Sequence, residues 1–102
     1  MFSRVTQLEI DTMRTTVEEA VAAFDTEVMP SLQELEGFAG AVVLTTPEGR
    51  GMIISLWETE ESARAAGGFA SEELERRMTL FRAPPGREYY TVALAHLPTL
   101  AA

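Results

Sequence analysis

The sequence contains no cysteine, no lysine and no asparagine among its 102 residues. The absence of cysteine excludes disulfides, a thiolate nucleophile and any zinc site built on sulfur. All eight cationic residues are arginine, and they stand against 16 carboxylates, which gives a net charge of −8. Binding to nucleic acid needs a basic face, so this balance argues against a nucleic-acid partner and disfavours an anionic membrane surface.

Long hydrophobic runs are also missing. No stretch reaches the roughly 18 apolar residues that a membrane-spanning helix needs. The first seven residues, MFSRVTQ, lack the apolar region of a signal peptide. With 46% hydrophobic residues over 102 positions, we expect one folded domain covering residues 1–102 and located in the cytoplasm.

The spacing of apolar residues predicts four strands and two helices. Strands are expected at 2–10, 38–46, 52–58 and 88–96. The first helix is expected at 16–36, with a kink near 26–30 caused by Pro30. The second helix begins after Thr59, breaks at Gly67 and Gly68, and resumes after an N-cap at Ser71.

This order, βαββαβ, is that of the α+β ferredoxin-like fold, in which both helices cover one face of a four-stranded antiparallel sheet. The strands at 38–46 and 52–58 are apolar on both faces, although a half-exposed antiparallel strand would alternate apolar and polar residues. We expect Ala41 and Val43 on the face without helices. Burial is worth roughly 25 cal/mol per Å², which favours a homodimer that pairs two open sheet faces into a barrel.

One set of residues carries a family resemblance, in this order along the chain: Pro30, Leu32, Glu36-Gly37-Phe38 with Gly40, Gly51, Ser55-Leu56-Trp57-Glu58, and Glu60-Glu61 with Ala63. Their order and spacing resemble the antibiotic-biosynthesis-monooxygenase-like family of dimeric α/β-barrel proteins. The resemblance implies a cavity between the sheet and the helices of each monomer. It also implies one of several activities, among them cofactor-independent oxidation of polycyclic phenols and quinols, and haem degradation.

The haem-degrading branch of that family uses an asparagine on the first strand, a tryptophan ending the third strand, and a histidine about ten residues later. These positions fall at Thr6, Trp57 and Gly67. Glycine cannot ligate iron, so we expect no haem. His96 is the single histidine, which rules out a multi-histidine metal site. We therefore expect neither a cofactor nor a metal.

In the oxygenase branch the deprotonated substrate itself gives an electron to O₂. The protein supplies a base or a hydrogen bond and a dry pocket. The resemblance places a helpful arginine at Arg77. Two other polar positions of the family fall at Ile53 and Ala63, which carry no polar group.

The candidate catalytic residues are therefore Trp57, Arg77 and Thr6. Trp57 either stacks on an aromatic substrate or fills the space under the second helix. Arg77 either reaches an anionic substrate or pairs with Glu73 on the helix surface. The acidic run from Glu58 to Glu61 is best explained as the N-terminus of a helix.

The candidate pocket residues are Phe24, Ser55, Met78, Phe81, Tyr90 and His96. Tyr89 and Tyr90 lie on opposite faces of the last strand, and Tyr90 shares a face with Val92 and Leu94, which makes it the interior candidate. His96 titrates near neutrality, and at a strand end it is either solvated or catalytic. Ser55 and Thr6 need hydrogen-bond partners if they are buried.

Three functions remain open. The first is a cofactor-independent monooxygenase acting on an aromatic or quinol-like small molecule. The second is a non-catalytic dimeric protein that binds a small aromatic or hydrophobic ligand. The third is a dimerisation module with a filled core. The presence or absence of an interior pocket separates the third from the other two.

Overall fold

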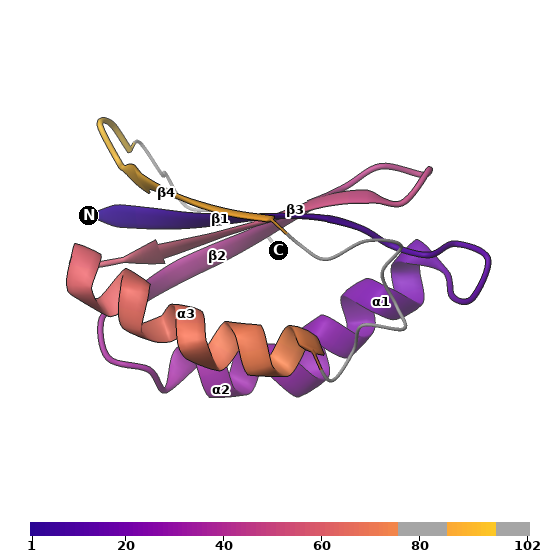
Figure 1. The fold of residues 1–102 in the computed structure, drawn as a ribbon, viewed down its shortest axis with the longest axis horizontal. Helices are drawn as coiled ribbons and strands as arrows, with labels where there is room; N and C mark the ends of the chain where they lie inside the picture. Colours follow the sequence, from indigo (N-terminus) through magenta and orange to yellow (C-terminus); the bar gives the residue numbers. More distant parts are fainter. Residues whose placement is uncertain (76–85, 96–102) are drawn as a thin grey trace.

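A computed structural model describes residues 1–75 and 86–95 of the chain. The elements are β1 (Phe2–Glu9), α1 (Val17–Ala23), η1 (Phe24–Val28), α2 (Met29–Gln33), β2 (Phe38–Thr45), β3 (Arg50–Trp57), α3 (Glu60–Glu75) and β4 (Gly86–Thr91). The strands form one antiparallel sheet in the order β2-β3-β1-β4, and the helices all lie on one side of it (Figure 1). The α+β ferredoxin-like architecture predicted from the sequence is confirmed.

The first helical segment is shorter than predicted and changes type in the middle. It starts after Thr16, whose side-chain hydroxyl accepts the Glu19 N–H at 3.1 Å. Residues 24–28 form η1, a π-helix in which the Met29 N–H bonds to the Phe24 carbonyl. Pro30 has no N–H to give to the preceding turn, so the wider turn accommodates the proline where the kink was expected.

The helix α3 corrects a prediction, because it runs through Gly67, Gly68 and Ser71 without a break. Its start is as predicted, with the Ser62 N–H bonded to the Thr59 hydroxyl at 3.0 Å. A glycine weakens a helix by about 1 kcal/mol relative to alanine, which packing can outweigh. Gly67 is buried, and a Cβ there would lie 2.8 Å from the Tyr89 hydroxyl, so the glycine leaves room for that hydroxyl beside α3.

The hairpin of β2 and β3 corrects a second prediction. Phe38 pairs with Trp57 and Gly40 pairs with Leu56, so Ala39 is an extra residue in a β-bulge. The bulge shifts the alternation of β2 by one position. Ala41 and Val43 therefore share the helix-covered face with Phe38, whereas Gly40, Val42 and Leu44 lie on the open face.

The strand β4 corrects a third prediction, because it covers Gly86–Thr91 and not residues 88–96. Tyr89 pairs with Arg4 on the covered face, and Tyr90 pairs with Ser3 on the open face. The alternation predicted from Val92 and Leu94 was wrong because both residues lie beyond the end of the strand. Tyr90 is 48% exposed and is not an interior residue.

The open face of the sheet carries a patch of apolar side chains, which we call the open-face patch: Val5, Val42, Leu44, Met52, Ile54 and Leu56. Val42 and Leu44 remain 43% and 49% exposed. A bare apolar face was expected, although β2 contributes different residues to it. Among the described helices, none combines the length and the apolar character needed to cross a membrane.

Candidate functional site

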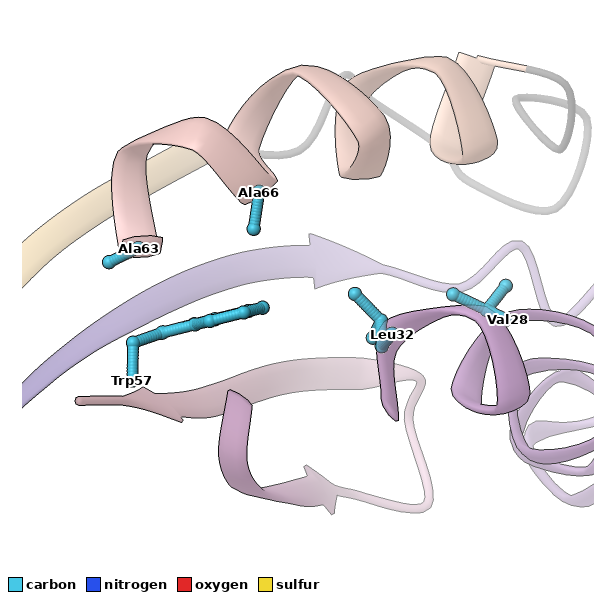
Figure 2. Close-up of a cluster of buried hydrophobic side chains, with 5 residues drawn as sticks. All are labelled: Val28, Leu32, Trp57, Ala63 and Ala66. Atoms are coloured by element: carbon cyan, nitrogen blue, oxygen red, sulfur yellow. The ribbon is translucent and has the colours of Figure 1, made fainter. Parts of the chain in front are cut away.

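The interior between the sheet and α3 is built around Trp57. Its ring is fully buried and extends along the sheet toward Leu32, with Ala63 and Ala66 of α3 on the helix side (Figure 2). Phe38 meets the indole edge to face, with ring centroids 5.4 Å apart. The small alanine side chains leave room for the large indole between the two layers. Trp57 thus fills the space under α3, as its structural interpretation requires.

Polar side chains are buried beside this hydrophobic cluster. Arg4, Thr6 and Ser55 are 3%, 3% and 1% exposed. Arg4 pairs with Ser55 across β1 and β3, so the two share the covered face with Trp57. Burying a polar group is unfavourable unless it is hydrogen-bonded, and burying a charge is more so. These three residues define the candidate site.

Ser55 connects the site to the tryptophan. Its hydroxyl donates to the Arg4 carbonyl oxygen at 3.3 Å and accepts the Trp57 Nε1–H at 2.9 Å. Residues two apart on a strand project from the same face, which brings the hydroxyl to the indole nitrogen. Ser55 therefore satisfies the one polar atom of the buried indole and fixes the orientation of the ring.

Arg4 and Tyr89 extend the site across β1 to β4. The Arg4 guanidinium carbon lies 5.7 Å from the centre of the Trp57 ring, within the range of a cation–π contact. Tyr89 pairs with Arg4 on the other side and packs against the hydrophobic cluster. On its helix side, the guanidinium of Arg64 lies 4.5 Å over the Tyr89 ring.

A pocket opens at the other end of the covered face, where α1 begins. Its volume is about 460 Å³, within the range of small-molecule sites. It is lined by Thr12, Thr15, Thr16, Val17, Glu18, Thr45, Thr46 and Pro47. None of the α1 residues is buried. The covered face is therefore filled tightly at the Trp57 end and incompletely at the α1 end.

The structure brings together only part of the predicted site. Thr6, Ser55 and Trp57 share the covered face, and Phe24 packs half-buried against the same cluster. Tyr90 faces the opposite side of the sheet. Four further candidates lie outside the described residues: Arg77, Met78, Phe81 and His96.

Sequence reasoning missed Arg4 and Tyr89. The signal for Arg4 was present, since it lies between Phe2 and Thr6 on a face that must be covered by helices. A charged residue at such a position marks either a site or a buried ion pair. Tyr89 was missed because the end of β4 was placed too far along the chain. Within the described part of the chain, no three acidic or histidine side chains gather into a metal-binding group.

Comparison with known proteins gives a distant sequence relationship. No family model matches the chain. It is 30% identical over 97 residues to the uncharacterised proteins Rv2558 and MT2635 of two Mycobacterium tuberculosis strains. The match covers 94% of this chain but only 40% of the relatives' length.

Solved structures give a closer relationship in fold. The monooxygenase ActVA-Orf6 of Streptomyces coelicolor, in complex with nanaomycin D, aligns with a TM-score of 0.69 at 22% identity over 96% of this chain and 92% of that chain. The cofactor-independent oxygenase SnoaB of Streptomyces nogalater aligns with a TM-score of 0.68 at 13% identity, over 92% and 94%.

The haem degrader MhuD of Mycobacterium tuberculosis, with two haems bound, also has a TM-score of 0.68, at 14% identity over 94% of this chain and 99% of that chain. Proteins of different chemistry therefore share this architecture. The chain has the fold of the antibiotic-biosynthesis-monooxygenase-like family. The fold by itself does not select one activity.

Proposed function

We propose that this chain is a cofactor-independent monooxygenase acting on an aromatic or quinol-like small molecule held between the sheet and the helices. The observation that carries the proposal is the buried polar group of Arg4, Thr6 and Ser55 beside Trp57, on the covered face of this fold. Support comes from ActVA-Orf6 and SnoaB, which have the same fold and are named as oxygenases.

The chemistry assigned to the protein is limited to binding and proton control. With an anthrone, loss of a proton gives an anion that reduces O₂; the ring CH₂ becomes a carbonyl, and the second oxygen atom leaves as water. The open pocket near α1, lined mainly by threonines, is the proposed place of entry for the substrate. Thr6 and Arg77 are proposed to contact substrate oxygens, and Trp57 to fix the wall of the site.

We also propose that the functional unit is a homodimer joined through the open-face patch. A single chain leaves this patch in water, and apolar burial against an identical sheet removes that penalty. Two-fold pairing is the commonest way to close such an interface. The mycobacterial relatives are longer, and the part of them that this chain does not match is long enough for another domain of this size.

A second candidate function is non-catalytic binding of a small aromatic ligand. It is favoured by the apolar side chains of Ile53 and Ala63. At these two positions, oxygenases of the family that the sequence resembles carry polar groups. Both residues are buried in the core of this chain and have no group that can move a proton.

Oxygen uptake with a panel of anthrones and quinols distinguishes the two candidates. A monooxygenase consumes one O₂ per anthrone oxidised, above the uncatalysed rate, and the rate saturates with substrate. Saturable binding of the same compounds without oxygen uptake contradicts the monooxygenase and supports the binding protein. If the compounds cause no oxygen uptake and do not bind, both candidate functions are contradicted.

A further inference from the structure

We propose that the threonine-lined pocket beside α1 binds an uncharged, hydroxylated group, such as a sugar ring or another polyol, and disfavours anionic ligands. This inference goes beyond the proposed function, because it assigns a class of ligand to the pocket itself and holds whether or not that ligand is oxidised. It concerns the end of the covered face that the core around Trp57 does not fill.

The first argument is that the two walls of the pocket are fixed. One wall is the connection from β1 to α1, and the other is the end of β2 with the hairpin turn that follows (Figure 1). The Ile10 N–H donates to the Gly49 carbonyl oxygen at 2.7 Å and so ties the two walls together. Within the first wall, the Met13 and Thr15 N–H groups both bond to Asp11, at 3.1 Å. A pocket that is formed in advance loses little conformational entropy when a ligand binds.

The second argument is the supply of hydroxyl groups. Five of the eight described residues that line the pocket are threonines. The hydroxyls of Thr16 and Thr46 each accept a backbone N–H at 3.1 Å, which leaves their own O–H to donate. Thr12 and Thr45 are exposed, and their hydroxyls bond to no other residue in the part of the chain that the structure describes. Since a hydroxyl both donates and accepts, these four groups match the hydroxyls of a sugar.

The third argument is the apolar surface between these hydroxyls. Each threonine also carries a methyl group, and Val17 and Pro47 add to this surface. A sugar ring has hydroxyls around its edge and C–H groups on its faces, so it needs polar and apolar contacts side by side. Small-molecule sites combine the two in this way, with a few polar groups that fix the orientation of the ligand.

The fourth argument is charge. Among the described lining residues, Glu18 is the charged one, and it is an anion. Glu19, in the same turn of α1, adds a second negative charge. The neighbouring arginines are directed elsewhere: Arg14 pairs with Asp11 at 3.3 Å, and Arg50 projects from the open face of β3. An anionic ligand would therefore meet a like charge without a cation to bind it, whereas an uncharged hydroxyl can donate to the Glu18 carboxylate.

The test uses three probes that share one ring. They are methyl β-D-glucoside, methyl β-D-glucuronide, in which a carboxylate replaces the CH₂OH group, and methoxytetrahydropyran, which has no hydroxyl. Dissociation constants are measured by NMR titration of the unaltered chain. We expect the glucoside to bind at least about tenfold more tightly than either of the other two, since two net hydrogen bonds account for a factor of this size.

Variants of the pocket locate the binding. Thr12→Val and Thr45→Val each remove a hydroxyl and keep the size of the side chain, and each should weaken glucoside binding about three- to tenfold. Thr45→Ser keeps the hydroxyl and should retain binding. Thr91→Val is the matched control, because Thr91 is an exposed threonine of β4 outside the pocket, and it should leave binding unchanged. Glu18→Gln removes the like charge and should bring the dissociation constant of the glucuronide closer to that of the glucoside by about two- to fivefold.

The outcomes separate this inference from the proposed function. If the glucuronide or methoxytetrahydropyran binds as tightly as the glucoside, the inference is overturned, and equal effects of Thr45→Val and Thr91→Val overturn it too. If none of the three probes binds, the inference fails, while oxygen uptake with anthrones, which carry no sugar, still decides the proposed function. Circular dichroism checks that each variant is folded; should Thr45→Val not fold, Thr12→Val, in the connection before α1, decides instead.

Discussion

Both faces of the sheet depart from those of a simple globular domain. The covered face buries an arginine, a threonine and a serine beside Trp57, whereas the open face leaves Val42 and Leu44 more than 40% exposed. Burial of polar groups and exposure of apolar groups are both unfavourable for an isolated chain. The exposed apolar groups of the open face therefore indicate something that the single chain does not contain, whereas the Ser55 hydroxyl of the covered face already has its hydrogen-bond partners.

The polar groups of the covered face are directional, since the Ser55 hydroxyl is bonded to both the Trp57 indole and the Arg4 carbonyl oxygen. The open face offers apolar area without direction, which suits a second sheet. Mutations on the two faces should accordingly affect different properties.

The largest expected effect on folding is on the covered face. Trp57→Ala removes a fully buried indole from between the sheet and α3, and we expect a loss of about 3–5 kcal/mol in the free energy of unfolding. Denaturant titration at fixed protein concentration measures it. Met13→Ala, at an exposed position before α1, serves as the control and should change stability little. A loss below about 1 kcal/mol for Trp57→Ala contradicts the assigned core.

A substitution on the open face should weaken self-association of the chain and leave its fold unchanged. Val42→Glu places a carboxylate in the open-face patch, where an interface with a second apolar sheet would bury the charge without a partner. We expect self-association to weaken at least about 100-fold, or about 3 kcal/mol, measured by sedimentation across a concentration series. Ala22→Glu introduces the same charge on the exposed side of α1 and should leave association unchanged. Equal effects of the two variants would rule out this face as the interface.

A smaller effect is expected from the hydrogen bond within the site. Ser55→Ala leaves the buried Trp57 Nε1–H without the acceptor at 2.9 Å, and an unsatisfied buried donor costs about 1–3 kcal/mol. Denaturant titration and the tryptophan fluorescence spectrum report the change, since this is the single tryptophan. Ser55→Thr keeps the hydroxyl and should recover part of the stability. If Ser55→Ala changed neither the free energy of unfolding nor the fluorescence spectrum, the hydrogen bond from Trp57 to Ser55 would not orient the indole.

The smallest expected effects come from a matched pair on α3. Gly68→Ala meets no atom within 4 Å and should stabilise the helix by about 1 kcal/mol. Gly67→Ala places its Cβ 2.8 Å from the Tyr89 hydroxyl, so Tyr89 must shift and that gain should be lost. Thermal denaturation of both variants measures the difference. Equal stabilisation by both would contradict the close contact between Gly67 and the Tyr89 hydroxyl.

The order of elements was predictable from hydrophobic spacing, because helical periodicity and short apolar runs bounded by turn residues alternate clearly along the chain. The phase of individual strands was harder to predict. A single extra residue, Ala39, moved Ala41 and Val43 to the covered face, and no composition signal marks such a bulge except the neighbouring Gly40. For β4, the apolar residues beyond the end of the strand led to the wrong alternation of faces. Tyr90 was therefore predicted to face the interior, although Tyr89 does so.

The candidate site was predicted in part for the same reasons. Trp57, Ser55 and Thr6 were identified because they sit on strands whose phase was correct. Arg4 was not singled out, because the chemistry of a buried guanidinium depends on the degree of burial, which the sequence alone does not give. The break predicted at Gly67 did not occur, because tertiary packing against Tyr89 outweighs the low helix propensity of glycine.

Sedimentation equilibrium of the unaltered chain at micromolar concentration tests the central claim, that another copy covers the apolar side of the sheet. We expect a species of twice the chain mass of 11.2 kDa. A well-folded species of 11.2 kDa across that concentration range, with native circular dichroism, would contradict it.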